Sequence, residues 1–251
     1  MSTTKPSGRI ERARAKAARA RRKRPLTLPA IVDVALRIVD DEGTEAVSMR
    51  RVAAEFDTGP ASLYAYVANK DELLRHVLDR IIEEIEVPAG GSWQDVVRGF
   101  AFNTRRVYQR HSDAARLSFA HIPSGTGMLE GTERVLKAMI EGGVPDKVAA
   151  WSLDILAAYV AADAFEGWLL EQRFDDGSGR DPEEIGKEFV DQVHDTFAAM
   201  PADRFPYLIR TMDVMMDGSS EERFGFGIDM LIAGFAAQIP QPGKHPNRGR
   251  R

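Results

Sequence analysis

The residues best suited to contact a polyanion lie in one short segment that contains Tyr64, Tyr66 and Lys70. Leu63 and Val67, four residues apart, are placed to face a core, which leaves both tyrosines on the open side of a short helix. A face that is merely solvated would carry Lys or Glu there. Lys70 falls in the first turn of the next predicted helix, where the helix dipole disfavours a cation by about a few tenths of a kcal/mol. A phosphate bound at that helix N-terminus would offset this penalty.

Residues that could take part in acid–base catalysis are present without the motifs that accompany catalysis. They are His111, His121, Asp163 and Glu166. No nucleophile motif or glycine-rich phosphate loop accompanies them, and none of the five histidines lies three or four residues from another. The chain contains no cysteine, which excludes disulfides and thiolate metal sites. We therefore expect no enzyme activity, no metal and no cofactor, with a helical enzyme as a remote alternative.

Positive and negative charges are distributed unevenly along the chain. The net charge of −4 hides a basic arm, residues 1–24, that contains ten Lys or Arg and a single Glu and so carries +9. A basic tail adds Lys244, Arg248, Arg250 and Arg251. Taken alone, the arm is equally consistent with a solvated tail. Because residues 25–75 sum to −4, we expect the arm to supply much of any affinity of this half for a polyanion.

Neither a signal peptide nor a membrane span is expected. No apolar segment follows the basic N-terminus, and the longest apolar stretch, from Ile155 to Leu170, is interrupted by Asp163 and Glu166. These features predict a cytoplasmic protein with no membrane partner.

Helical periodicity runs through almost the whole chain, which predicts an all-α fold. The first helix is expected to run from its N-cap at Thr27 to Glu42, with Gly43 as its C-cap. Its inner face is formed by Ile31, Ala35 and Ile38.

Three more helix starts follow closely. The second helix should begin at the N-cap Ser48 and end in the turn 57–59, and the third should open at Pro60. Asn69 caps the fourth, with Glu72 in the capping-box position. Three short helices with a tight turn between the second and third form the layout of a helix-turn-helix. A small structural bundle is the alternative that spacing alone leaves open.

Three stretches resemble the tetracycline-repressor-like (TetR/AcrR) regulators: 46–56, 59–67 and 69–74, which together contain the pattern Leu-Tyr-x-x-Val-x-x-Lys-x-x-Leu. The resemblance implies contacts of Ser48 and Arg50 with the DNA backbone. It further implies base-edge contacts from Pro60, Ala61 and Ser62, contacts of Tyr64 and Tyr66 with phosphate or thymine methyls, and a phosphate clamp at Lys70. By its position in the helix, Ala65 lies on the same open side as the tyrosines. The turn departs from the family pattern at Asp57-Thr58, but Asp tolerates a positive φ, so we expect the turn to form.

Beyond this region, roughly seven more helices are expected, up to about Gln238. The predicted breaks are 88–92, 111–113, 123–127, 142–145, 175–182, 201–206 and 217–219. The segment 148–174 is apolar nearly all round, and 220–237 carries a stripe of Phe224, Ile228, Leu231 and Phe235. The resemblance implies that two such helices from each of two subunits form a four-helix bundle, and a monomer is the alternative. A homodimer would read a palindromic operator.

The second half also resembles the effector-binding half of the tetracycline repressor. Its landmarks are Ser92-Trp-Gln, Arg105-Arg106, Asp113-Ala-Ala-Arg116 and Leu170-Glu-Gln172. On these landmarks, two drug-contacting histidines of the repressor would fall at Ser118 and Glu86, so tetracycline is not expected as the effector.

A small apolar or aromatic effector is expected to bind this half and release the DNA. The candidate contacts are Phe100, Asn103, Arg106, Trp151, Tyr159, Asp163 and Trp168. Asp163 stands out because a carboxylate within an apolar run needs water, a cation or a hydrogen-bonding partner. An activator, or a ligand-independent regulator of the same fold, is the alternative.

These features predict four regions: a basic arm at 1–24, a helix-turn-helix domain at 25–70, a helical effector-binding and dimerisation domain at 71–237, and a basic tail at 238–251.

Overall fold

A computed structural model of the chain describes residues 25–240, except 112, 123 and 175–180. The predicted basic arm and the tail from residue 241 therefore lie outside the described residues. The described part is all-α, as predicted, and contains no strand. Contacts divide the chain into two units: residues up to Ile85 with Val107–Glu130, and Glu86–Arg106 with the residues from Gly131 onward. One boundary follows Ile85, between helices, and the other two fall inside helices α5 (Trp93–Arg110) and α7 (Thr126–Glu141).

The first unit begins with α2, which spans Leu28–Glu42 and has the predicted caps. The Thr27 hydroxyl accepts the N–H of Ala30 at 3.3 Å, and Gly43 ends the helix with a φ of +81°. A short 3₁₀ helix, η1 (Thr44–Ala46), then leads into α3 (Met49–Ala54). Its N-cap is Ser48, whose hydroxyl accepts the N–H of Arg51 at 3.1 Å.

The turn after α3 forms as predicted, and the helix after it is tighter than expected. Asp57 adopts a positive φ of 53°, the conformation expected of this residue. The segment Pro60–Ala65 is a 3₁₀ helix, η2, closed by bonds such as Tyr66 N–H to the Leu63 carbonyl at 2.9 Å. A helix this short has few α-type bonds to gain, which favours the tighter form.

Helix α4 (Lys70–Ile82), the last turn of α5 and α6 (Ala114–Ala120) complete the core of the first unit. Val107 and Leu117 pack with α2 and α4, so this core extends beyond the three helices of the helix-turn-helix. Its fully buried side chains include Ile31, Ala35, Val39, Val52, Leu63, Leu73, Val77 and Ile81.

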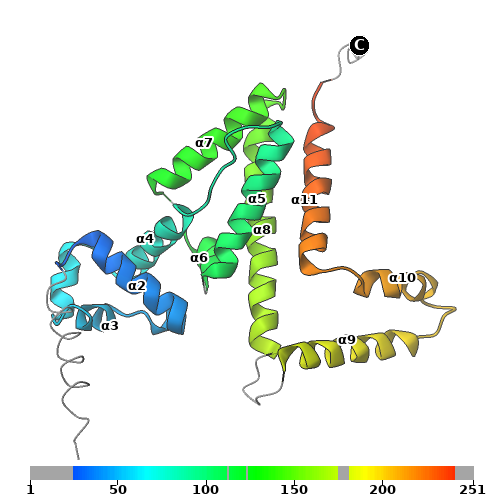
Figure 1. Ribbon diagram of the computed structural model, residues 1–251, viewed down its shortest axis with the longest axis horizontal. Helices are drawn as coiled ribbons and strands as arrows, with labels where there is room; N and C mark the ends of the chain where they lie inside the picture. Colours follow the sequence, from blue (N-terminus) through cyan, green and yellow to red (C-terminus); the bar gives the residue numbers. More distant parts are fainter. Residues whose placement is uncertain (1–24, 112, 123, 175–180, 241–251) are drawn as a thin grey trace, which may run out of the picture. The chain divides into compact units, whose positions relative to one another are not determined.

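The second unit contains most of α5 and α7 together with four further helices. These are α8 (Asp146–Phe174), α9 (Pro182–Ala198), α10 (Pro206–Met216) and α11 (Ser220–Ala236). The predicted breaks overlap gaps between helices wherever they fall on described residues, and residues 112, 123 and 175–180 of these breaks lie outside the described part. Helices α8 and α11 run side by side, and α9 and α10 pack against each other (Figure 1).

Helix α11 buries the predicted stripe within its own chain. Phe224 and Ile228 are fully buried, Phe235 is 6% exposed, and Leu231 is partly buried in the same core. The close approach to α8 depends on Gly227, because a Cβ there would collide with Tyr159. The predicted stripe is therefore the inner face of α11, and any contact with a second subunit must use another face.

Candidate nucleic-acid interface

The exposed residues of η2 form a compact face beside the start of α4. Tyr64 is 54% exposed and Tyr66 40% exposed, and Ala61 and Ala65 are also exposed. Leu63 and Val67 lie in the core on the opposite side, as their spacing predicted. Seven residues are together called the reading surface below: Pro60, Ala61, Ser62, Tyr64, Ala65, Tyr66 and Lys70. Its Pro60 and Ser62 are half-buried, and the Ser62 hydroxyl lies 2.8 Å from that of Thr58.

Helix α3 adds a cation and a cap at its own N-terminus. Arg50 and Arg51 are adjacent and exposed, but only Arg51 is paired, with Glu42 at 2.6 Å. Arg50 makes no ion pair with any described residue, so its guanidinium remains available to an outside anion. Ser48 is exposed, although its hydroxyl already caps α3.

Lys70 is the first residue of α4 and makes no ion pair within the described part of the chain. Asn69 caps the helix by accepting the N–H of Glu72 at 2.8 Å. The predicted capping box is only half formed, because the Glu72 carboxylate accepts the N–H of Ala68, at 2.6 Å, and not that of Asn69. The helix start presents a cation together with the positive end of a helix dipole, which is suited to a phosphate.

The Tyr66 hydroxyl has a partner that the sequence did not reveal. It donates a hydrogen bond to the backbone carbonyl of Leu26 at 2.8 Å, across 40 residues of chain. The hydroxyl of Tyr64 makes no such bond with the described residues. The two tyrosines therefore present different chemistry on the same face.

Polar contacts at the C-terminal end of α5 connect it to the helix-turn-helix. His111 is 8% exposed, with Nδ1 3.0 Å from Asp40 on α2 and Nε2 3.3 Å from Glu84 just after α4. Glu84 also accepts from Arg110 at 2.9 Å. His111, a candidate for catalysis by residue type alone, thus joins segments of the first unit. Among the described residues, no group of three or more His, Asp or Glu is arranged to hold a metal ion.

Asp113 holds the turn that leads into α3. Its Oδ2 accepts the N–H of Thr44 at 2.8 Å and the Thr44 hydroxyl at 2.7 Å. Asp113 itself has a φ of +59°, and its Oδ1 is buried with no hydrogen-bond partner. The contact spans 69 residues, so no local sequence signal could have indicated it.

In the second unit, Asp163 has a protein partner. Its carboxylate lies 2.5 Å from Nε of Arg105, whose Nη2 donates to the Ser220 hydroxyl at 2.6 Å. Tyr159, one turn before Asp163, stacks on Phe224 with ring centroids 5.5 Å apart. Burial, and then the negative charge of Asp163, raise the pKa of Tyr159.

The other predicted effector contacts are spread over the unit. Asn103 donates to the Glu86 carbonyl at 2.8 Å and accepts from Arg106 at 3.0 Å. Asn103 thus connects Arg106 to Glu86, the position at which a drug-contacting histidine of the repressor would fall. Phe100 packs against the core of this unit. Trp168 stacks on a neighbouring ring of α8. Trp151 is 61% exposed and lies twelve residues from Asp163, about 18 Å along α8.

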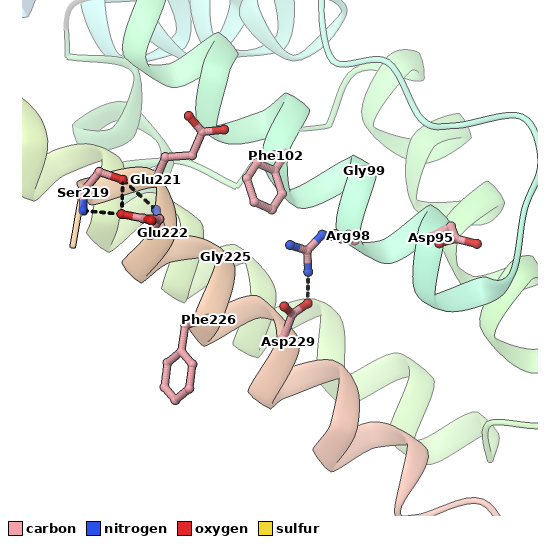
Figure 2. A pocket seen from close by; sticks show the side chains of 10 residues that line it. All are labelled: Asp95, Arg98, Gly99, Phe102, Ser219, Glu221, Glu222, Gly225, Phe226 and Asp229. Carbon is pink, nitrogen blue, oxygen red and sulfur yellow. Dashed lines mark hydrogen bonds and ion pairs between the residues drawn. The ribbon is translucent and has the colours of Figure 1, made fainter.

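A groove of about 960 Å³ lies between α5 and α11 (Figure 2). Arg98 of α5 points toward Asp229 of α11 and forms an ion pair with it, whereas Phe226 points away from α5. Hydrogen bonds from Ser92 lower the pKa of Asp95, and hydrogen bonds from Ser219 lower that of Glu222. The carboxylates of Asp95, Glu222 and Asp229 thus each have a hydrogen-bond or ion-pair partner within the chain.

Comparison with known proteins decides the family. Residues 31–77 match the model "Bacterial regulatory proteins, tetR family", and residues 87–239 match "Tetracyclin repressor-like, C-terminal domain". The chain belongs to the TetR family. The match to the first model includes the whole reading surface, and the chain is accordingly a DNA-binding transcriptional regulator.

Individual relatives support the TetR-family assignment over most of the chain. The HTH-type transcriptional repressor DrrR1 of Streptomyces coeruleorubidus is 31% identical over 222 residues, which cover 87% of this chain and 80% of the relative. The structure of apo ActR from Streptomyces coelicolor is 37% identical, with a TM-score of 0.75, covering 86% of this chain and 97% of ActR. The structure of Streptomyces coelicolor ActR in complex with actinorhodin is also 37% identical, with a TM-score of 0.76. It covers 87% of this chain and 100% of ActR.

Proposed function

We propose that this TetR-family chain is a homodimeric repressor that binds a palindromic operator and leaves it when a small molecule occupies the second unit. The observation that carries the proposal is the reading surface, where Tyr64 and Lys70 make no side-chain hydrogen bond or ion pair with the described residues. Exposed aromatic groups beside a lysine at a helix N-terminus suit base edges and phosphates. Pro60, Ala61, Ser62 and Ala65 are small enough to let η2 approach base edges.

Contacts with the DNA backbone come from Lys70 of this surface and from two residues at the start of α3, Ser48 and Arg50. Arg50 is free of ion pairs with the described residues, and Lys70 sits at the N-terminus of α4. Ser48 contributes less, because its hydroxyl is already engaged in capping α3. Such phosphate contacts fix the register of a protein on the duplex, and the side chains of η2 read the sequence.

Exposed apolar faces on α8 and α11 support the dimer. On α11 and at its C-cap, four exposed apolar residues follow steps of four, three and four: Phe226, Met230, Ala233 and Ala237. On α8, the same steps connect Trp151, Ile155, Ala158 and Ala162. Large apolar side chains exposed at this spacing form the seam of a helix-packing interface. We accordingly assign Trp151 to the dimer interface and not to the effector site.

A dimer also explains the hydropathy of α8. Residues Asp146–Leu170 are long and apolar enough to cross a membrane by length and composition alone, yet only 33% of the apolar window is buried within the chain. A second subunit packed on the exposed face would cover the remainder, so we propose a soluble protein that acts in the cytoplasm.

For the effector, ActR provides a functional parallel, because it has been solved with actinorhodin. We propose that a small molecule binds in the second unit near Asn103 and Arg106, with Phe100 and Tyr159 as apolar contacts. Asp163 and Trp168 would support the residues that contact the ligand, since both are already engaged with neighbouring side chains.

The proposal is tested by selecting bound sequences from random DNA with the full-length protein. We expect a palindromic site with its half-sites about one helical turn apart. Lys70→Ala should weaken binding to that site by about 1–3 kcal/mol. Lys137→Ala is the matched control, because Lys137 is an exposed lysine of α7 far from the reading surface in the sequence. No enriched sequence, or equal effects of the two substitutions, would contradict the proposal.

A further inference from the structure

The segment that leads into the basic arm is fastened to the edge of the reading surface. Leu26 lies one residue before the N-cap of α2, and its carbonyl accepts the hydrogen bond of Tyr66 at 2.8 Å. The side chain of Leu26 is half-buried and packs against the core of the first unit. Leu26 is therefore held at two points, through its side chain and through its backbone.

The position of Leu26 determines where the cations of the arm begin. The arm ends in four consecutive cations, Arg21-Arg22-Lys23-Arg24, and only Pro25 separates them from Leu26. Each chain link spans about 3.8 Å between Cα atoms. Whatever path the arm takes, its last cations start within a few chain links of η2.

The hydrogen-bonding capacity of a phenol makes two roles of Tyr66 mutually exclusive. A tyrosine hydroxyl has a single proton to donate, and phosphate oxygens can only accept. Tyr66 therefore cannot donate to Leu26 and to a DNA phosphate at the same time. Tyr64, which is 54% exposed and makes no hydrogen bond with the described residues, is the tyrosine free to donate to a phosphate.

We propose that Tyr66 is a positioning residue for the basic arm, and this inference rests on the proposed DNA-binding function. The hydrogen bond to Leu26 makes the arm leave the first unit beside η2, so that the arm meets phosphates next to the bases that η2 reads. Without it, the arm samples more directions, and fewer of its cations reach the same duplex.

The test combines Tyr66→Phe with a full-length chain in which the ten Lys and Arg of residues 1–24 are replaced by Gln. Affinity for a mixed-sequence DNA duplex is measured as a function of salt. With the native arm, Tyr66→Phe should weaken binding at low salt, because a less well-directed arm neutralises fewer phosphates. It should also flatten the slope of log K against log salt by about 0.9 for each phosphate that the arm no longer neutralises. With the neutral arm, Tyr66→Phe should have no further effect.

Tyr64→Phe is the matched control, because it removes a hydroxyl from the same short helix. Its effect should be the same with the native and with the neutral arm. An equal loss from Tyr66→Phe in both backgrounds would show a direct DNA contact and overturn the proposal. Unchanged affinity of Tyr66→Phe with the native arm would also overturn it.

The outcome separates this inference from the proposed function. If only the role of Tyr66 is wrong, the wild type still binds DNA in a salt-dependent manner and Lys70→Ala still weakens that binding. If the proposed function is wrong, the wild type itself shows no such binding. Melting temperatures of all variants should show that each remains folded, with Tyr66→Phe losing no more than the small contribution of one exposed hydrogen bond.

Discussion

Asp113 is the single residue on which the turn between α2 and α3 depends most directly. Its carboxylate accepts two hydrogen bonds from Thr44, and it does so from a left-handed backbone conformation. A non-glycine residue with positive φ is strained and persists only where its surroundings hold it there. The hydrogen bonds to Thr44 supply that restraint and bring η1 against the corner between α5 and α6.

Thr44→Val should therefore destabilise the protein while preserving the shape of the side chain. The hydroxyl donates to a buried carboxylate, and hydrogen bonds to charged groups contribute about 1.5–3 kcal/mol. For a chain of this length, that loss should lower the melting temperature by about 3–10 °C, measured by circular dichroism.

Thr211→Val provides the matched comparison for this prediction. The Thr211 hydroxyl donates to the Tyr207 carbonyl of its own helix and is exposed, so its removal should change the melting temperature by no more than about 2 °C. Equal melting of wild type and Thr44→Val would show that the contact with Asp113 contributes little to stability.

At the scale of elements, α8 and α11 each present one face to their own core and another to solvent. On α11, Phe224 and Ile228 are fully buried, whereas Phe226 is 68% and Met230 54% exposed. Leu231 and Phe235, which sequence reasoning placed at the subunit contact, belong to the inner face. The distinction matters for mutagenesis, because changes on the inner face should unfold the chain, whereas changes on the outer face should separate the subunits of the proposed dimer.

Ile155→Asp or Met230→Asp should convert the dimer to monomers without unfolding it. Both side chains are about half exposed in the single chain, at 47% and 54%, and the proposed interface covers them. An unpaired charge between apolar surfaces costs several kcal/mol. Light scattering should report half the wild-type mass, and binding to the palindromic operator should be lost, since one η2 reads only a few base pairs.

Leu129→Asp is the control for the dimer prediction. Leu129 lies on α7, outside the proposed seam, and is 62% exposed, so it should leave the mass unchanged. A wild type that is monomeric at the concentrations used for DNA binding would exclude the dimeric arrangement altogether.

At the scale of the whole molecule, repression by a ligand-released regulator requires coupling between ligand binding and DNA binding. A hundredfold loss of operator affinity corresponds to about 2.7 kcal/mol, within the usual range for coupling between two sites. By reciprocity, operator DNA must weaken ligand binding by the same factor.

We expect a small molecule that binds the second unit to raise the melting temperature and to weaken operator binding. A thermal-shift screen should begin with actinorhodin, the molecule present in the ActR structure, and extend to small aromatic compounds. Hits are then titrated into the protein–operator complex and followed by fluorescence polarisation. Tight ligands that leave operator affinity unchanged would argue against release by ligand.

Arg106→Ala locates the ligand in this experiment. Arg106 is exposed and bonded to Asn103, so its loss should reduce ligand affinity and leave operator affinity without ligand unchanged. Arg134→Ala, an exposed arginine on α7, should affect neither.

Local chemistry was sufficient to predict the helices and the family. Thr27, Ser48 and Asn69 cap their helices as predicted, because a capping hydrogen bond joins residues three apart. The positive φ of Asp57 and the buried pair Leu63 and Val67 follow from equally short-range rules. Each of these features depends on residues within one or two turns of one another, so the sequence displays both partners together.

The features that only the tertiary structure decided join residues far apart in the chain. The Tyr66 hydroxyl meets Leu26, Asp113 meets Thr44, and Asp163 meets Arg105, across 40, 69 and 58 residues respectively. Which face of α8 and α11 is buried also depended on neighbouring helices, since apolar residues cover both faces. Periodicity shows that a helix has apolar faces, but only packing determines which of them the chain covers itself and which it leaves for a partner.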